Sequence, residues 1–247
     1  MKVRIFESSQ EATHEAAALF IEQIQRKPDC VLGLATGSTP IKLYKELILA
    51  YKEGTISFKR VKTFNLDEYV GLDRLHTQSY YRFMCEQLFD HVDIDKRNCH
   101  VPNGQAKNIE REVMQYEAAI EAAGGIDMQL LGIGGNGHIG FNEPGCNLDC
   151  GTHLESLTRQ TIQDNARLFF NGNEAQVPRQ ALTMGVGTIL RARRCVLLAF
   201  GKSKQVAVQG MIEGPITKNN PASVLQRHPD TVVLLDTLAA EKLKKKG

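Results

Sequence analysis

A glycine-rich segment directly after a short apolar run carries the residues best suited to acid–base chemistry. The segment, residues 132–144, reads GIGGNGHIGFNEP, and its glycines allow a tight turn and a close approach of the backbone to a small molecule. Within it, His138 can exchange a proton near neutral pH, and Glu143 can orient the imidazole and stabilise its charge. Asn136 can fix the imidazole tautomer through a hydrogen bond. These residues predict a site that moves protons on a bound metabolite.

Two residue pairs suggest metal binding, and neither is complete. His138 and Glu143 have no third or fourth ligand nearby in the sequence. Cys146 and Cys150 are the only close cysteine pair, and a zinc site would need a second pair. We therefore predict no metal site, and we interpret the two cysteines as loop thiols.

A second loop, residues 36–40, is suited to holding a phosphate group. Gly37 permits a close approach of the backbone to a ligand. Hydroxyl groups come from Thr36, Ser38 and Thr39. We expect Thr39 to cap the helix that follows, with Pro40 at its first position, and the free amides of that helix end to attract an anion. A capped turn without a ligand explains the same residues about equally well. The chain has no Walker sequence and no GxGxxG sequence after its first strand.

Two adjacent carboxylates, Asp67 and Glu68, follow a strand predicted over residues 61–66. In a doubly wound sheet the carboxyl ends of the strands face the ligand crevice. Adjacent side chains point to opposite sides, so we expect only one of the two acids to face it. Solvated acids on a surface loop are the alternative. We favour the surface-loop alternative less, because this loop shares the sheet edge with residues 36–40 and 132–144. Buried charges at that edge are costly unless they serve binding or catalysis.

Two cations are placed to complete a phosphate site. Arg167 lies on a short helix predicted over residues 164–170, and Lys204 lies at the start of a helix predicted over residues 202–212. Arginine offers a fork of donors to a phosphate, and lysine offers a point charge. Taken alone, each is better explained as a surface cation. The other histidines show no spacing that suggests chemistry: His14, His76, His91, His100, His153 and His228.

The elements that position these residues alternate along the chain. Apolar runs predict strands at residues 30–35, 61–66, 126–133, 181–184, 195–200 and 231–235. Helical periodicity predicts helices at residues 10–26, 41–52, 77–89, 109–123, 164–170 and 202–212, and one that ends near residue 192. This alternation predicts an α/β fold: one Rossmann-like domain over residues 1–247, with a doubly wound, mostly parallel sheet and helices on both faces.

Composition argues against several classes of protein. The 247 residues are 42% hydrophobic and 23% charged, with a net charge of +2, which is typical of a globular protein and gives no strong field for nucleic acid or an anionic membrane. The apolar runs are too short to span a bilayer, and the N-terminus has no secretory apolar region. We therefore expect a cytoplasmic protein with reduced cysteines, whose basic end, residues 242–247, is solvated.

Four segments resemble the glucosamine-6-phosphate deaminase family of amino sugar catabolism, and the resemblance runs over nearly the whole chain. They are GLATGSTP (33–40), TFNLDEYVGL (63–72), GHIGFNEP (137–144) and ALTMG (181–185). The related 6-phosphogluconolactonases share the phosphate loop and the Gly-His pair, but they are expected to carry a WDER-like segment and a GHTASLF-like continuation. This chain has no tryptophan. Lactone hydrolysis is therefore the second hypothesis, and a non-catalytic sugar-phosphate sensor is the third.

The resemblance implies isomerisation and hydrolytic deamination of glucosamine 6-phosphate to fructose 6-phosphate and ammonia, without a metal or an organic cofactor. In the family, the residue matching Asp67 moves a proton from C2 to C1, and the residue matching His138 opens the sugar ring. Glu143 matches the glutamate that supports this histidine, and Asn136 takes a position that is aspartate in some members. The phosphate is held by the residues matching Thr36, Gly37, Ser38, Thr39, Arg167 and Lys204.

Further expectations concern regulation and assembly. Some family members carry an activator site for N-acetylglucosamine 6-phosphate soon after the Asn-Glu-Pro motif. This chain has His153 and Glu155 at the basic positions of that site, so we expect hyperbolic kinetics without such activation. Residues 155–178 are expected to close over the substrate, since Arg167 must reach the phosphate from there. Family members differ in oligomeric state, and the sequence leaves a homo-oligomer open.

Overall fold

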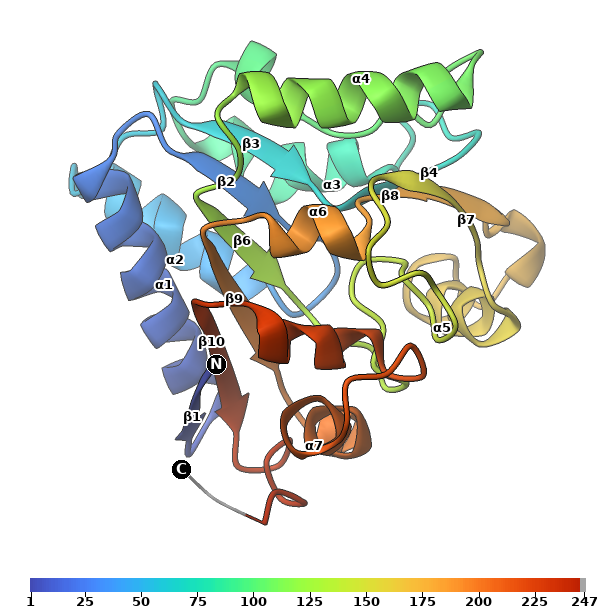
Figure 1. Cartoon of the computed structure of the whole chain (residues 1–247). Coiled ribbons are helices and arrows are strands. Elements are labelled where there is room, and N and C mark those ends of the chain that lie inside the picture. Colours follow the sequence, from blue (N-terminus) through green and yellow to red (C-terminus); the bar gives the residue numbers. More distant parts are fainter. Residues whose placement is uncertain (245–247) are drawn as a thin grey trace.

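The structure is a computed structural model that describes residues 1–244, apart from the side chains of residues 168 and 169. Figure 1 shows a central sheet between layers of helices. None of the helices in residues 1–244 combines the length and the apolarity that a membrane crossing needs. The predicted solvated end, residues 242–247, is partly wrong, because Leu243 is buried in the main core. Residues 245–247 lie outside the described residues.

Seven parallel strands form the central sheet, in the order β1-β10-β9-β6-β2-β3-β5. They are β1 (Lys2–Phe6), β2 (Val31–Leu34), β3 (Lys62–Asn65), β5 (Cys99–His100), β6 (Met128–Leu131), β9 (Arg194–Ala199) and β10 (Thr231–Asp236). Every residue of β2, β6 and β10 is buried, which explains their apolar composition. The predicted parallel α/β sheet is confirmed, and one domain over residues 1–247 stays a prediction.

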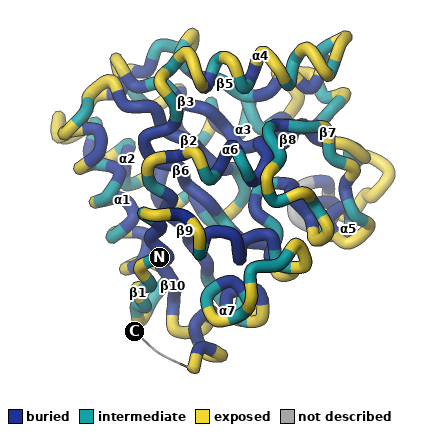
Figure 2. Tube along the Cα trace, viewed as in Figure 1, coloured by how far each residue is buried: buried dark blue, intermediate teal, exposed yellow. Residues whose placement is uncertain are grey.

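Helices cover both faces of this sheet. They are α1 (Ser9–Arg26), α2 (Ile41–Lys52), α3 (Tyr80–Gln87), α4 (Ile109–Ala122), α6 (Val186–Leu190) and α7 (Gln205–Glu213). In Figure 1, α1 and α2 lie on one side of the sheet and α6 and α7 on the other. Ser8 caps α1 by accepting a hydrogen bond from the backbone N–H of Glu11, and the buried side chains of α1, such as Phe20 and Ile24, recur at helical spacing. Figure 2 shows that strands inside the central sheet, such as β2, β6 and β10, are buried, whereas β1 at its edge is partly exposed.

A second sheet of three antiparallel strands lies beside the central one, and the sequence analysis did not predict it. The strands pair in the order β4 (Asp67–Tyr69), β8 (Gln180–Thr183) and β7 (His153–Ser156). Next to it, α5 (Arg159–Phe169) contributes to a small apolar cluster, separate from the main core, that includes Tyr69, Phe141 and Ile162. Of its strands only β8 was predicted, at residues 181–184, and it pairs in this antiparallel sheet and not in the parallel one. The strands β4 and β7 contain polar residues and give no apolar run.

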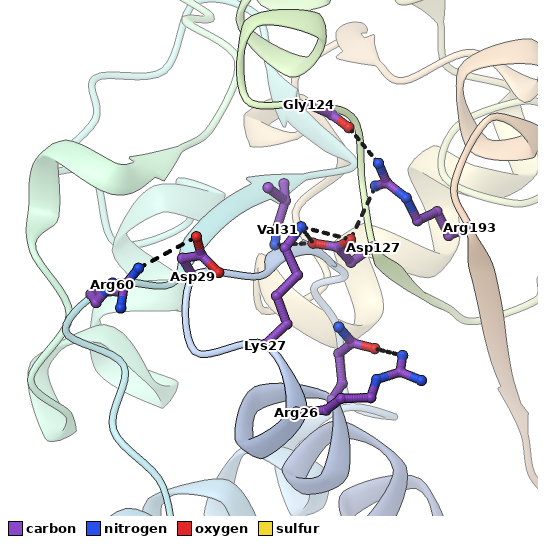
Figure 3. Close-up of polar contacts among 9 residues, drawn as sticks. Arg26, Lys27, Asp29, Val31, Arg60, Gly124, Asp127 and Arg193 are labelled. Carbon is purple, nitrogen blue, oxygen red and sulfur yellow. Dashed lines mark hydrogen bonds and ion pairs between the residues drawn. The ribbon is translucent and has the colours of Figure 1, made fainter.

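A charge network fixes the amino end of the central sheet (Figure 3). Asp127, just before β6, is only 5% exposed. Its carboxylate accepts hydrogen bonds from Lys27 Nζ at 2.8 and 3.0 Å and from the backbone N–H of Val31 at 2.8 Å. Arg193 Nη1 donates a further bond at 3.0 Å. Val31 begins β2, Arg193 directly precedes β9, and Lys27 ends α1, so one paired carboxylate ties the starts of β2, β6 and β9 to the end of α1.

Candidate active site

A cavity of about 650 Å³ opens at the carboxyl end of the central sheet, where the strand order reverses between β2 and β6. Its walls come from the segments that follow β2, β3, β6 and β9 and from α5. Most of the predicted site residues line it: Thr36, Gly37, Ser38, Thr39, Asp67, His138, Arg167 and Lys204. Asn136 and Glu143 do not line the cavity and lie next to His138.

Of the two adjacent acids, Asp67 faces the cavity and Glu68 does not, as the alternation of side chains predicts. Glu68 accepts hydrogen bonds from Ser79 Oγ at 2.7 Å and from the backbone N–H of Tyr80 at 3.0 Å. It therefore binds the free amides at the amino end of α3, where a negative charge is stabilising. Glu68 is a structural residue, and Asp67 is left as the acid available to a ligand.

Asp67 is 6% exposed, and no group in the described part of the chain donates a hydrogen bond to its carboxyl group. Burial, and then the charge of Glu68, raise its pKa to about 8. Gly140 allows the loop of His138 to pack against this acid, because a Cβ atom at position 140 would lie 3.0 Å from Thr183 Oγ1 and 3.5 Å from Asp67 Oδ2. A carboxyl group with a pKa near neutrality can both take up and return a proton.

The imidazole of His138 lies against the backbone of its own loop. A Cβ atom at Gly134 would fall 2.2–2.5 Å from three atoms of the ring, so the ring fills the space of a side chain at that position. Gly137 has a φ of 89°, in the left-handed region that favours glycine. Nδ1 of His138 lies 3.6 Å from Glu143 Oε2 and has no hydrogen-bond partner among residues 1–244. Packing therefore positions the ring, and Glu143 is close enough to stabilise a positive charge on it.

Glu143 is held as a carboxylate by its neighbours. Its Oε1 accepts a hydrogen bond from Thr161 Oγ1, and its Oε2 accepts one from Asn136 Nδ2 at 2.8 Å. Burial acts to raise its pKa, but His138, Thr161 and Asn136 outweigh burial and lower the pKa to about 2. The negative charge that faces His138 therefore persists at neutral pH.

The predicted hydrogen bond from Asn136 to the imidazole is wrong. Asn136 Oδ1 accepts a bond from the backbone N–H of His138 at 3.2 Å, and Asn136 Nδ2 donates to Glu143. The short side chain bonds the backbone two residues further on, as asparagine often does in tight loops. Asn136 thus positions the loop and Glu143, and acts on the ring only through them.

The predicted phosphate loop lines the cavity between β2 and α2. Gly37 has a φ of 94°, a conformation that other residues rarely adopt. The predicted cap is wrong by one position, because α2 begins at Ile41 with Pro40 at the N-cap, and no side chain caps it. The amides of the first turn of α2 are therefore left available to an anion.

One face of α5 contributes cavity residues that the sequence analysis did not select. The helix begins at Arg159, capped by Thr158, and not at residue 164 as predicted. The residues not selected are Thr161, Asp164 and Asn165, which line the cavity together with the predicted Arg167. Spacings of three and four residues relate several of them, so helical periodicity is the signal that identifies this face once the start of the helix is known.

Asp164 brings a negative charge into the predicted phosphate site. Its Oδ1 lies 3.3 Å from Arg167 Nη2. Burial lowers the pKa of Lys204, and the charge of Asp164 opposes that effect. Lys42, another residue that the sequence analysis did not select, also lines the cavity and adds a further cation. Without a ligand, Asp164 therefore partly neutralises the cations that a phosphate group would meet.

Comparison with known proteins shows the family to which this chain belongs. Residues 6–234 match the model of the glucosamine-6-phosphate isomerases and 6-phosphogluconolactonases, and the chain belongs to this family. A glucosamine-6-phosphate deaminase of Cellvibrio japonicus is 55% identical over 243 residues, which are 98% of this chain and 92% of the relative. One of Clostridium botulinum is 51% identical, and the match covers 100% of both chains. The resemblance identified from four sequence segments is confirmed.

Solved structures support the same assignment of the fold. The structure of a monomeric glucosamine-6-phosphate deaminase matches with a TM-score of 0.94 at 44% identity, covering 98% of this chain and 99% of the other. A 6-phosphogluconolactonase from Trypanosoma cruzi matches with a TM-score of 0.79 at 20% identity, covering 99% of this chain and 97% of the other. At that lower identity the likeness concerns the fold alone.

Proposed function

We propose that this chain converts glucosamine 6-phosphate and water into fructose 6-phosphate and ammonia, in the breakdown of amino sugars. One observation carries the proposal. An unpaired carboxyl group with a raised pKa, Asp67, and an imidazole next to a fixed carboxylate, His138 with Glu143, meet at one cavity. The identity of 51–55% to deaminases over nearly the full chain supports it.

The first step is opening of the sugar ring. The phosphate is held by the loop of residues 36–39 and the amides of α2, with Arg167 and Lys204. His138, as an imidazolium stabilised by Glu143, donates a proton to the ring oxygen. The bond between this oxygen and C1 breaks, the C1 hydroxyl gives its proton to water, and the open-chain aldehyde forms.

The second step is proton transfer between adjacent carbons. Asp67, as a carboxylate, removes the proton from C2, which the neighbouring aldehyde makes acidic, and returns it at C1 of the enolamine. This leaves an imine at C2, to which water adds, and ammonia then departs to give the ketone. One carboxyl group can serve both carbons, and its poor solvation favours the protonated form that must follow the first transfer.

The proposal is tested by incubating the purified chain with glucosamine 6-phosphate and measuring ammonia and fructose 6-phosphate, which should appear in equal amounts. Asp67→Asn should lower turnover about a thousandfold, the range of a general base, while inorganic phosphate binds as before. Release of no ammonia, or hydrolysis of 6-phosphogluconolactone instead, overturns the function. Near-normal turnover of Asp67→Asn overturns only the assignment of the base.

The location, assembly and regulation of the enzyme are also proposals. All six cysteines are unpaired, which supports a cytoplasmic location. The deaminase at 44% identity is described as monomeric, which supports turnover by a single copy of this chain, with a homo-oligomer as the alternative. With His153 and Glu155 at the basic positions of the activator site, rate curves are hyperbolic. A sigmoidal curve that N-acetylglucosamine 6-phosphate makes hyperbolic would contradict this.

We also propose that residues 155–178 close over the bound substrate. This segment packs mostly on the small apolar cluster and not on the main core, through residues such as Leu157, Phe170 and Val177. Segments with few contacts to the main core are the ones that open most easily. Structures with and without a sugar phosphate that superimpose over these residues would contradict the closure.

A further inference from the structure

Asn165, on α5, lines the cavity and has no part in the proposed proton transfers. It is only 9% exposed, so its amide is largely enclosed by protein. Nδ2 donates a hydrogen bond of 2.7 Å to the hydroxyl oxygen of Tyr69, a residue that is 1% exposed. An amide has a donor end and an acceptor end, and fixing one end fixes the direction of the other. Tyr69 therefore holds the side chain of Asn165 in one orientation.

The acceptor end of this amide is open to the cavity. Oδ1 of Asn165 bonds no group in the described part of the chain, and it is not among the polar atoms that the protein encloses completely. Any ligand that displaces water from this oxygen must supply a hydrogen-bond donor in its place, because an unpaired carbonyl oxygen is costly in a largely buried position. The side chain is therefore placed to accept a hydrogen bond from a ligand.

The surroundings of Asn165 are aromatic. Tyr69 belongs to the small apolar cluster, and its ring lies 4.8 Å from that of Tyr80 and 5.8 Å from that of Phe141, measured between centroids. The rings of Tyr80 and Phe141 are stacked, with 11° between their planes, and both residues line the cavity. Ring faces pack well against carbon–hydrogen bonds and do not replace the hydrogen bonds of a hydroxyl group. Asn165 Oδ1 therefore gives this apolar wall a fixed polar atom.

The position of Asn165 along α5 indicates which part of a sugar phosphate it meets. At one end of the helix, Thr161 bonds Glu143, the carboxylate that faces His138. Arg167, the proposed phosphate ligand, follows six residues later, about 9 Å further along the helix axis. Asn165 lies between these two residues on the side of the helix that lines the cavity. A six-carbon sugar with its phosphate near Arg167 and its reacting carbons near His138 therefore presents its middle carbons to Asn165.

We propose that Asn165 is a specificity-determining residue, whose Oδ1 accepts a hydrogen bond from the hydroxyl group on C3 or C4 of the sugar phosphate. The inference rests on the proposed function, because the roles of His138 and Arg167 set the direction of the sugar in the cavity. A fixed acceptor selects its ligand, since a sugar without the hydroxyl leaves the oxygen unpaired. Tyr69 is a positioning residue that acts through Asn165.

The test measures the binding of glucitol 6-phosphate by calorimetry. This compound carries the hydroxyl groups and the phosphate of the sugar but no carbonyl group, so it cannot react. Asn165→Ala should raise its Kd about tenfold and leave the Kd of inorganic phosphate within about twofold. Gln163→Ala is the matched control, because it removes an amide that lies on the same helix and does not line the cavity, and it should change neither value. Tyr69→Phe keeps the amide and removes its anchor, so the Kd of glucitol 6-phosphate should rise about threefold.

The 3-deoxy and 4-deoxy analogues of glucitol 6-phosphate identify the bonded hydroxyl. Losing it should weaken binding to the wild type about tenfold, whereas Asn165→Ala should bind that analogue and the parent compound about equally. An unchanged Kd in a folded Asn165→Ala variant, or losses that add to those of both analogues, overturns the inference. Circular dichroism reports folding, and Tyr69→Phe provides the test if Asn165→Ala does not fold. Because the probe does not react, this outcome is separate from the release of ammonia, which decides the proposed function.

Discussion

Two aspartates, one at each end of the central sheet, are buried to the same degree and lie in opposite environments. Asp127, 5% exposed, accepts hydrogen bonds from two cations and one backbone amide. Asp67, 6% exposed, lies beside Glu68 and has no donor among the described residues. Burial alone therefore does not decide what an acid does. Its partners decide whether it fixes the fold or holds a mobile proton.

Removing the charge of Asp67 should have the largest effect on both stability and turnover. In the folded protein its pKa of about 8 lies above the ordinary value of 3.8, so between these pH values only the unfolded state ionises and the native protein loses stability as the pH rises. Asp67→Asn avoids this loss. Relative to wild type, we expect it to gain on the order of 5 kcal/mol between pH 4 and pH 8, while turnover falls about a thousandfold.

Denaturant unfolding of both proteins at the two pH values measures this gain. A stability difference that stays constant with pH would show that Asp67 is ionised in the free enzyme. For the same reason, kcat/KM of the wild type should fall as the pH drops below about 8, since the carboxylate is the reactive form.

The same substitution at the other end of the sheet should have the opposite effect. Asp127→Asn removes charge-assisted hydrogen bonds that hold the starts of three strands. We expect a loss of about 2 kcal/mol and a fall in Tm of roughly 5 °C, with turnover of the folded fraction within about twofold of wild type. Thermal unfolding and activity per folded molecule test this. A large loss of turnover at full stability would mean that the two ends are coupled.

Asn136→Asp adds an acid to the pair formed by Glu143 and His138. The new carboxylate would lie where an amide now donates to Glu143 Oε2 at 2.8 Å. More negative charge near the ring favours the imidazolium, so the basic limb of the turnover profile should move to higher pH by about one unit. Turnover measured across pH is the readout. An unchanged profile would show that the loop isolates the ring from charge at position 136.

Asp164 is intermediate between Asp127 and Asp67, because it is paired with Arg167 only while no ligand is bound. Because its carboxylate lies 3.3 Å from Arg167 and a phosphate must compete with it, Asp164→Asn should lower KM about threefold and tighten the binding of inorganic phosphate. Glu174→Gln removes the same charge from a nearby segment that does not line the cavity, and it should leave both values unchanged. A raised KM in Asp164→Asn would mean that the acid positions Arg167 for binding.

The central strands were predictable because burial on both faces gives them continuous apolar runs, as in β2 and β10. The edge strands β1 and β5 carry half-exposed residues and leave no such signal. The small sheet is defined by pairing between Asp67 and Thr183, which are distant in sequence, so no local pattern indicates it. The start of α5 was missed because its first turn is polar.

The site was predictable where its residues share a loop and unpredictable where they meet through the fold. His138, Glu143 and the phosphate loop are local motifs. The partner that fixes the charge of Glu143 is not local, since Thr161 reaches it from α5, whose first turn was not predicted. The pair of Asp164 and Arg167 was within reach, because both lie in the predicted helix at a spacing of three residues. Asn136 was assigned the wrong partner because the direction of a short side chain in a glycine loop depends on backbone angles that the sequence does not state.

A single hydroxyl group, that of Thr161, joins the helix that carries Arg167 to the carboxylate that faces His138. A ligand that draws α5 inward would therefore alter the surroundings of His138, the proposed ring-opening acid. Such linkage is reciprocal, so phosphate should bind with an affinity that follows the protonation of His138, and Thr161→Val should abolish that dependence. Binding of the phosphate, several bonds away from the carbons that react, would then control proton donation by His138.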